Sequence, residues 1–251
     1  MSRTAVEHLD VVVVGAGLSG IAAGHYLRTA CPWASYAVLE GRDDLGGTWD
    51  LFRYPGIRSD SDMHTLGYSF RPWRGAHSIA DGPEILEYLR ATAADEGVDR
   101  HIRFRHRVRS AEWSSSAGHW LLTVDVTGDD GGVSTTRLTC GFLFSCAGYY
   151  RYDRGYEPEL EGIASFQGQV VHPQFWPEHL DVTGQRVVVI GSGATAMTLV
   201  PALARSAAHV TMLQRSPTYV LSRPRRSRAA AVLRRTLPRR WADPAVRWLH
   251  A

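Results

Sequence analysis

The chain has 251 residues, of which 44% are hydrophobic and 21% charged, a composition typical of a globular protein with one or two domains. No apolar run approaches the about 18 residues of a membrane span, and the short apolar run over 11–14 lacks the basic n-region and cleavage site expected of a signal peptide. All 28 basic residues are arginine, which excludes a lysine nucleophile, and the three cysteines have no metal-ligand spacing. We therefore expect a cytoplasmic protein with neither a disulfide framework nor a metal site.

The first part of the sequence predicts a strand, a glycine turn, a helix and a second strand. Residues 9–14 form an apolar run typical of a buried parallel strand, and small and apolar residues at helical spacing follow over 19–28. A short strand over 36–39 ends at Glu40. Elements in this order within about 30 residues make a βαβ unit.

The glycine turn has the GxGxxG pattern of dinucleotide sites, with Gly15 for the tight turn, Gly17 for close approach to a pyrophosphate and Gly20 for helix–strand packing. Glu40 is placed to accept hydrogen bonds from ribose hydroxyls, which favours FAD. A turn that only links strand to helix is the alternative, and Glu40 speaks against it. The motif's predicted FAD-binding residues are Gly15, Gly17, Ser19, Gly20 and Glu40.

The middle of the chain predicts a long loop followed by a helix and strands. Residues 41–82 are rich in Gly, Pro, Asp and aromatic residues without a clear period, which predicts a functional loop. A helix is expected over 83–96, with proline in its first turn and Gly97 as its stop. Four strands should follow, over 102–113, 119–126, 133–139 and 142–145.

The opening pattern returns after an irregular segment over 151–184. A strand over 186–190, a glycine turn, a helix over 198–206 and a strand over 209–214 are expected. The fold class is therefore α/β with two Rossmann-like dinucleotide-binding domains, the second truncated. The expected division is an FAD-binding domain with an antiparallel β insertion (1–150), a linker (151–184) and the first part of an NADPH-binding domain with a basic tail (185–251).

The second unit ends in Gln214, Arg215 and Ser216, where the first has Glu40. A carboxylate would repel the 2′-phosphate of NADPH, whereas an arginine can pair with it. The second site is therefore predicted to bind NADPH; an incidental surface arginine is the alternative. The residues predicted from this unit are Gly191, Ser192, Gly193, Ala194, Thr195, Ala196, Arg215 and Ser216.

Two long motifs carry a resemblance to a known family. Residues 166–177 fit the pattern FxGxxxHxxxWP, and residues 46–60 fit [A/G]GxWxxxx[F/Y]P[G/M]xxxD. The chain thus resembles the N-terminal half of the Baeyer–Villiger monooxygenases of the flavin-containing monooxygenase superfamily, most closely their ethionamide-activating branch. The fixed positions of the first motif are Phe166, Gly168, His172, Trp176 and Pro177.

The resemblance implies an activity and roles for individual residues. NADPH would reduce FAD, O2 would add to give a flavin C4a-peroxide, and one oxygen atom would pass to a ketone or to the sulfur of a thioamide or sulfide. Asp60 would orient a catalytic arginine beside the flavin, and Arg58 and Ser59 would lie at the nicotinamide; Asp60 as a loop cap paired with Arg58 is the alternative. The motif of residues 166–177, with His172, would couple domain positions. Further flavin contacts are expected from Thr48, Trp49, Leu51, Asp60 and the Val108 backbone.

The chain departs from this family by its length. Family members continue further, and the catalytic arginine and much of the substrate pocket lie beyond residue 251. A catalytically incomplete fragment that binds FAD without turnover is therefore the alternative function, and a complementing C-terminal polypeptide is an expected partner. A flavin disulfide reductase shares the two-site layout but needs a CxxxxC pair near the flavin, and the sequence has none there.

The tail from Arg223 onward holds nine arginines and one acid, Asp243. It lacks the interleaved glycines and aromatics of an RNA-binding segment, so nucleic acid is not an expected partner. A solvated helix is the favoured interpretation, and peripheral contact with a membrane surface is the alternative. Trp241, Val246, Trp248 and Leu249 are expected to be exposed.

Overall fold

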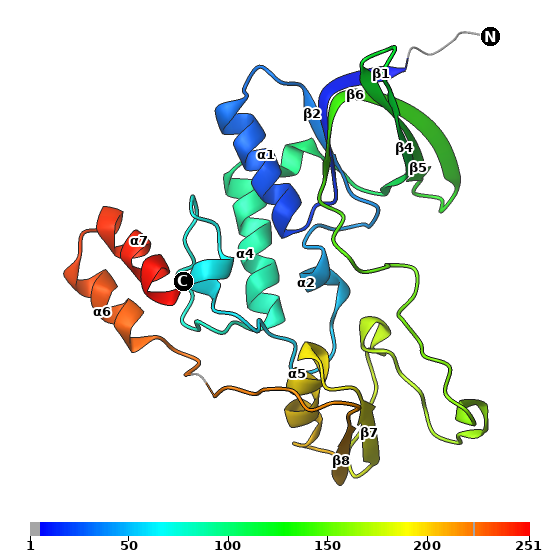
Figure 1. The fold of residues 1–251 in the computed structure, drawn as a ribbon, viewed down its shortest axis with the longest axis vertical. Helices are drawn as coiled ribbons and strands as arrows, with labels where there is room; N and C mark the ends of the chain where they lie inside the picture. Colours follow the sequence, from blue (N-terminus) through cyan, green and yellow to red (C-terminus); the bar gives the residue numbers. More distant parts are fainter. Residues whose placement is uncertain (1–5, 223) are drawn as a thin grey trace. The chain divides into compact units, whose positions relative to one another are not determined.

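The structure is a computed structural model that describes residues 6–222 and 224–251 (Figure 1). Arg223, the first residue of the predicted basic tail, lies outside the described residues. Internal contacts divide the chain into two units. Unit 1 consists of Met1–Asp50 and Leu86–Tyr150, and unit 2 consists of Leu51–Ile85 and Arg151–Ala251.

Unit 1 is built on a six-stranded sheet with the order β3-β2-β1-β6-β5-β4. Strand β1 pairs in parallel with β2 and β6, and β2 pairs in parallel with β3. Strands β4, β5 and β6 are antiparallel to one another in sequence order. The strands are β1 Glu7–Val14, β2 Tyr36–Leu39, β3 Ile102–Arg103, β4 His106–Ser114, β5 His119–Thr127 and β6 Val133–Ser145.

Helix α1 (Leu18–Ala30) follows β1 directly and packs on β1 and β2, as the predicted βαβ unit requires (Figure 1). Helix α4 (Gly82–Asp95) leads into this unit and is followed by a 3-10 turn, η1 (Asp99–His101). The apolar cluster on the sheet joins the parallel strands to the antiparallel ones through Leu9, Val12, Ala37, Leu39, Leu122, Val124, Leu138 and Cys140.

Two of the predicted strands of unit 1 differ in the structure. The strand predicted over 102–113 is broken into β3 and β4 at Arg105, whose φ of 58° is left-handed and cannot continue a strand. The strands predicted over 133–139 and 142–145 are one continuous strand, β6. It stays continuous because its first part pairs with β5 and its second part with β1, so every stretch has a partner.

Unit 2 holds the second strand–helix–strand unit. Strand β7 (Arg186–Ile190) pairs in parallel with β8 (His209–Leu213), and α5 (Ala194–Leu203) connects them. The helix predicted over 198–206 was therefore placed too late, because α5 begins immediately after the glycine turn with Gly193 as its N-cap. The predicted loop and linker also contain single turns: α2 (Thr48–Leu51), α3 (Met63–Leu66), η2 (Ile163–Ser165) and η3 (Pro173–Phe175).

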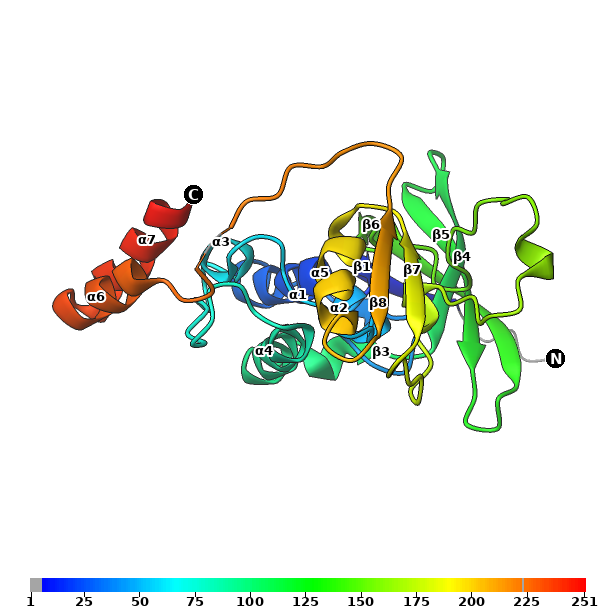
Figure 2. The same cartoon turned by 90° about the horizontal axis from the view of Figure 1, so that it is seen from below.

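The basic tail forms two helices rather than one, α6 (Arg228–Thr236) and α7 (Arg239–His250), drawn in orange and red in Figure 2. The prediction that Val246 is exposed is wrong: it is 1% exposed, because α7 packs on the segment of α3. Trp241, Trp248 and Leu249 are exposed as predicted. Among the helices described, none has the length and apolar character needed to span a membrane.

Candidate functional site

The two glycine turns have the same backbone geometry. Gly15 has a φ of +101° and its amide donates to the Leu39 carbonyl at 2.8 Å. Gly191 has a φ of +121° and its amide donates to the Leu213 carbonyl, also at 2.8 Å. A positive φ of this size is open to glycine and strained for other residues. Each turn is thus fastened to the end of the next strand in the same way.

The helices that follow the turns begin without side-chain caps. Gly17 caps α1 and Gly193 caps α5, and neither helix has a side-chain cap hydrogen bond or an acidic residue in its first turn. Side-chain caps are present at α3, where Asp62 accepts from the third residue, and at α6, where Ser227 does so, whereas α7 begins after Pro238 without one. Uncapped first-turn amides and the positive end of the helix dipole favour an anion.

Among the described residues, only backbone atoms lie within 4 Å of the position that a side chain at Gly17 would take. A Cβ added at Gly17 would lie 3.6 Å from the Cα of Gly47, so two glycine backbones border the same space. A Cβ at Gly20 would lie 1.8 Å from the Gly15 carbonyl oxygen, so this position is closed by the turn itself. The corresponding residue of the second turn is Ala196, which is buried. Gly17 is therefore bordered by backbone, while Gly20 allows the close packing of helix and turn.

Glu40 is buried at the end of β2, with 2% of its surface exposed. Its two carboxylate oxygens accept from the amides of Ala16 at 2.8 Å and Arg42 at 3.0 Å. This contact ties β2 to the glycine turn, a role that the sequence analysis did not anticipate. Each carboxylate oxygen has two acceptor positions, so both retain capacity for a ligand hydroxyl.

A charged network lies beneath the loop of Gly46 and Gly47, and the sequence analysis missed it. The side chain of Asp50, 3% exposed, pairs with Arg42 Nη2 at 2.7 Å and faces Arg90 Nη2 at 3.6 Å. Arg42 Nη1 also donates to the Gly47 carbonyl at 3.3 Å. A buried carboxylate needs compensating cations, and Arg42 and Arg90 supply them to Asp50. Because Arg42 also binds the Gly47 carbonyl, it connects Asp50 to the loop. Arg42 and the acids Asp43, Asp44 and Asp50, all within nine residues, were the available signal.

The other predicted residues of unit 1 lie near this loop or beside β2. Thr48 and Trp49 are half-buried in α2, where the Trp49 amide donates to the Gly46 carbonyl at 3.1 Å. Ser19 is exposed in the first turn of α1.

Val108 packs its side chain on the sheet cluster, and the register of β4 and β5 shifts between Val108 and Ser110. The amide of His106 donates to the Glu40 carbonyl at 2.8 Å. The start of β4 is thereby hydrogen-bonded to the end of β2, which brings the backbone near Val108 close to the Glu40 end of the site.

In unit 2, the second half of the motif of residues 46–60 packs on α5. The Tyr54 hydroxyl hydrogen-bonds the Thr198 hydroxyl at 3.1 Å, and a Cβ on Gly56 would lie 2.6 Å from the Thr198 carbonyl oxygen. These contacts close around a buried cluster of Phe52, Tyr54, Leu199 and Leu203, with Leu51 and Trp176 packed against it. Tyr54 and Gly56 in this motif therefore serve packing.

Arg58, Ser59 and Asp60 lie next to one another with different environments. Ser59 is buried, and its amide donates to the Ala80 carbonyl at 2.9 Å while its hydroxyl accepts from the Ala80 amide at 3.1 Å. Arg58 forms an isolated bridge with Asp81. Asp60 is exposed, and the helix cap is Asp62 rather than Asp60. Within the described residues no ion pair joins Arg58 to Asp60.

The residues predicted for the second nucleotide surround the turn after β7. Ser192 donates from its hydroxyl to the Ser216 carbonyl at 3.3 Å, which ties the turn to the segment after β8. Arg215 is exposed and has no ion pair within the part of the chain that the structure describes. The other residues predicted there, Gly191, Gly193, Ala194, Thr195 and Ala196, form the turn and the first turn of α5.

The FxGxxxHxxxWP motif makes local contacts within unit 2. His172 caps η3 by accepting from the Gln174 amide at 3.2 Å, and its ring covers Gly155, where an added Cβ would lie 2.4 Å from the imidazole. Trp176 packs against the cluster of Phe52 and its neighbours. Phe166 is 60% exposed. The partners of His172 are thus the backbone amide of Gln174 and the backbone at Gly155.

The two remaining fixed positions of this motif lie beside the others. Gly168 lies against the Phe166 ring, 2.6 Å from an added Cβ, and the Pro177 carbonyl accepts from the Leu180 amide at 3.2 Å. Both contacts restrict the backbone conformation of the segment before β7.

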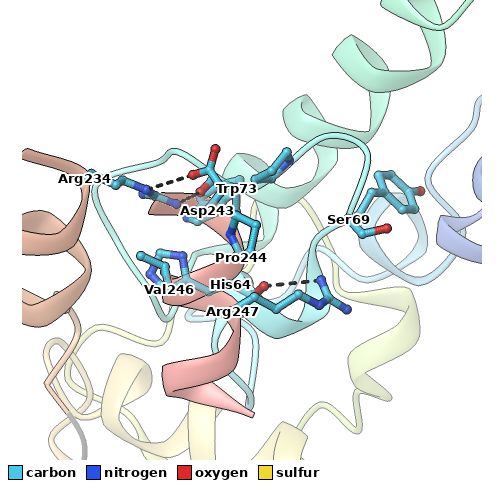
Figure 3. A pocket seen from close by; sticks show the side chains of 10 residues that line it. His64, Ser69, Trp73, Arg234, Asp243, Pro244, Val246 and Arg247 are labelled. Atoms are coloured by element: carbon cyan, nitrogen blue, oxygen red, sulfur yellow. Dashed lines mark hydrogen bonds and ion pairs between the residues drawn. The ribbon is translucent and has the colours of Figure 1, made fainter. Parts of the chain in front are cut away.

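A separate cavity of about 170 Å³ lies under α7, and none of the predicted site residues lines it (Figure 3). His64 is buried there, and burial together with the positive charge of Arg234 lowers its pKa to about 4. Its Nδ1 atom has no hydrogen-bond partner. Among the described residues no cluster of side chains could hold a metal ion. The cavity is lined by His64, Tyr68, Ser69, Pro72, Trp73, Arg234, Asp243, Pro244, Val246 and Arg247.

Comparison with protein families identifies the class of protein. The flavin-binding monooxygenase-like family matches residues 69–233, and the NAD(P)-binding Rossmann-like domain matches residues 13–89. The chain belongs to the flavin-binding monooxygenase-like family. The family and the α/β fold with a Rossmann-like domain, both predicted from the motifs, are thereby confirmed.

Individual relatives agree with this assignment. The chain is 58% identical over 243 residues to FAD-containing monooxygenase EthA of Mycobacterium tuberculosis, covering 96% of this chain and 49% of the relative. EthA of Mycolicibacterium smegmatis is 53% identical over 243 residues, covering 96% of this chain and 48% of the relative. The chain spans about half the length of these relatives.

Solved structures of monooxygenases show the same fold. An oxidized steroid monooxygenase bound to NADP matches with a TM-score of 0.72 and 33% identity, covering 85% of this chain and 40% of that one. The OTEMO complex with FAD and NADP matches with a TM-score of 0.71 and 33% identity, covering 85% and 40%.

Proposed function

We propose that this chain binds FAD and NADPH and forms the cofactor-binding part of a cytoplasmic monooxygenase. The reaction would insert one oxygen atom from O2 into a ketone or transfer it to the sulfur of a thioamide or sulfide. In this proposal, residues 1–150 serve FAD, residues 185–251 serve NADPH, and residues 151–184 link them. Binding of FAD without turnover is the second candidate.

The proposal depends most on one observation: the two glycine turns have the same backbone geometry, but the strands that follow them end in side chains of opposite charge. Gly15 and Gly191 make the same hydrogen bond to the following strand, each at 2.8 Å. After that strand, the first unit has the carboxylate of Glu40 and the second has the exposed guanidinium of Arg215. A carboxylate suits free ribose hydroxyls, and a guanidinium suits a 2′-phosphate.

The backbone of the first glycine turn and of the start of α1 suits FAD. The uncapped amides of α1 and the surroundings of Gly17, where an added Cβ would meet only the Gly47 backbone, suit a pyrophosphate. Glu40 would accept from the ribose hydroxyls, and Thr48 and Trp49 would border the flavin, Trp49 with a flat apolar wall. When bound, FAD supplies the activation of O2 and the transfer of one oxygen atom.

Arg215 and Ser216 would hold the 2′-phosphate of NADPH, while the amides at the start of α5 would face its pyrophosphate. Arg58 and Ser59 would contact the nicotinamide. The hydrogen bonds between Ser59 and Ala80 support this role, because they fix the backbone that presents Arg58.

Asp60 would act on the reaction through an arginine cation that the rest of the protein or a complementing polypeptide supplies. Its exposure supports this role, since the carboxylate has no ion pair among the residues described. In this arrangement Asp60 would hold the guanidinium in one orientation beside the reacting atoms.

Expression of the full chain tests the proposal directly. We expect the purified protein to retain FAD, seen as flavin absorbance that remains after gel filtration. Loss of all flavin after mild washing would contradict the FAD site. Turnover of phenylacetone or an aryl sulfide, followed by product analysis, then separates the active enzyme from the binding-only candidate.

The NADPH assignment has its own matched pair of variants. Loss of a hydrogen bond to a charged group costs about 1.5 to 3 kcal/mol, so Arg215→Ala should weaken NADPH binding by about 10- to 150-fold and leave NADH binding unchanged. Arg205→Ala removes another exposed arginine of unit 2 and should change neither. Calorimetric titration measures both nucleotides. Equal affinity of the unchanged protein for NADH and NADPH would contradict the role of Arg215.

A further inference from the structure

Helix α7 is held in one rotation by contacts along its buried side (Figure 3). The carboxylate of Asp243 pairs with Arg74 at 2.5 Å and with Arg234 at 3.3 Å. Arg247 Nη1 donates to the Gly67 carbonyl at 2.8 Å, and Val246 is 1% exposed. Because these contacts come from two successive turns, they fix which side of α7 is buried and which side faces outward.

That opposite side presents two indole rings. Trp241 and Trp248 are 61% and 83% exposed. They are seven residues apart, which is close to two turns of an α-helix, so both rings lie in one stripe. Arg240 flanks the stripe, with its guanidinium carbon 6.0 Å from the centre of the Trp241 ring. Single exposed tryptophans are common on protein surfaces, but two aligned indole rings beside arginines form a surface that is both aromatic and positively charged.

The surroundings of the stripe are strongly basic. The only acid of the tail, Asp243, is already paired with two arginines. Within the described residues no acid pairs with the exposed arginines of the two helices. These are Arg228, Arg235, Arg239 and Arg240, together with Arg247, which is also exposed and donates to the Gly67 carbonyl.

We propose that α6 and α7 form a docking surface for a membrane that carries anionic phospholipids. Indole rings favour the boundary between lipid headgroups and acyl chains, because they are apolar with one hydrogen-bond donor. Unpaired arginines attract the anionic headgroups and can extend to them. A second copy of the chain is a poorer occupant, since it would bring the same positive charge against this one. The proposal does not depend on the cofactor sites.

Vesicle flotation of the full chain tests this proposal. We expect binding to vesicles of equal parts phosphatidylglycerol and phosphatidylcholine, reduced by salt, and little binding to phosphatidylcholine alone. The double variant Arg239→Gln/Arg240→Gln should bind about 25-fold more weakly, at about fivefold per arginine. Trp241→Ala/Trp248→Ala should also lose binding. Trp33→Ala, which removes a tryptophan that is 77% exposed in unit 1, is the matched control and should bind normally.

A second measurement needs no variant. Brominated lipid in the same anionic vesicles should quench tryptophan fluorescence of the unchanged chain and shift its emission to shorter wavelength. Equal binding to neutral and anionic vesicles, no quenching by brominated lipid, or an equal loss in Trp33→Ala would overturn the proposal. So would salt-resistant self-association, or displacement from vesicles by nucleic acid at equimolar amounts.

Discussion

Replacement of Gly17 by alanine separates the cofactor role of the first glycine turn from its structural role. The φ of Gly17 is −80° with an extended ψ, a conformation that alanine adopts without strain. The added Cβ would lie 3.6 Å from the Gly47 Cα, which is ordinary van der Waals contact. The protein itself therefore accommodates the methyl group, whereas we expect the methyl group to hinder a pyrophosphate that approaches the same backbone.

The expected magnitudes differ for folding and for binding. Alanine is a poorer N-cap than glycine, so the free energy of unfolding should fall by about 0.5 to 1 kcal/mol. For a chain of this size that shifts the Tm by about 1 to 4 °C. Inserting a methyl group into a packed contact costs about 1 to 3 kcal/mol, which corresponds to FAD binding weakened by about 5- to 150-fold.

The assay is titration of the flavin-free chain with FAD, followed by fluorescence, together with thermal melting of the same sample. Gly193→Ala is the matched control at the second turn, because an added Cβ there meets no atom within 4 Å and its φ is −76°. It should leave FAD affinity unchanged. Unaltered FAD affinity in Gly17→Ala would refute the assignment of this space to the pyrophosphate.

Three further predictions concern contacts that the structure adds. Arg42→Ala should lower the unfolding free energy by about 3 kcal/mol, since it removes the guanidinium that pairs at 2.7 Å with the Asp50 carboxylate, which is 3% exposed. Exposed Arg100→Ala is the control, and an equal Tm for both variants would contradict this. Tyr54→Phe should cost about 1 kcal/mol in urea unfolding, because the Thr198 hydroxyl loses a partner at 3.1 Å, whereas Tyr149→Phe, 87% exposed, should cost nothing measurable. Burial lowers the pKa of His64 to about 4 in the folded chain, so the unfolded chain takes up a proton at higher pH than the folded chain does. The free energy of unfolding should therefore fall by about 3 kcal/mol as the pH drops from about 6.5 to about 4. The same pH dependence of stability in His64→Gln would argue against this.

Features that depend on local order were predictable from the amino-acid sequence. The strand, glycine turn and helix around Gly15 follow from residues close together in the chain, and the same holds for Gly191. The two long motifs also predicted the family, because their fixed spacing is a property of the sequence alone. The first βαβ unit was therefore placed nearly to the residue.

Features that depend on distant partners were not predictable in the same way. The continuity of β6 comes from two different neighbours, β5 and β1, and neither is visible in the local pattern of residues 133–145. Val246 is buried because α7 packs on a segment almost 180 residues earlier, where Arg247 reaches Gly67. Sequence periodicity shows that a helix has an apolar side and does not show what covers it.

The candidate site divides along the same line. Sequence alone determined the glycine turns and the contrast between Glu40 and Arg215, since these depend on residue type at fixed spacing. Only the tertiary structure decided that Glu40 also binds the amide of Ala16, and that Asp50 lies buried between two arginines. The physical reason is that hydrogen bonds and ion pairs form between groups that folding brings together, at distances along the chain that no local pattern records.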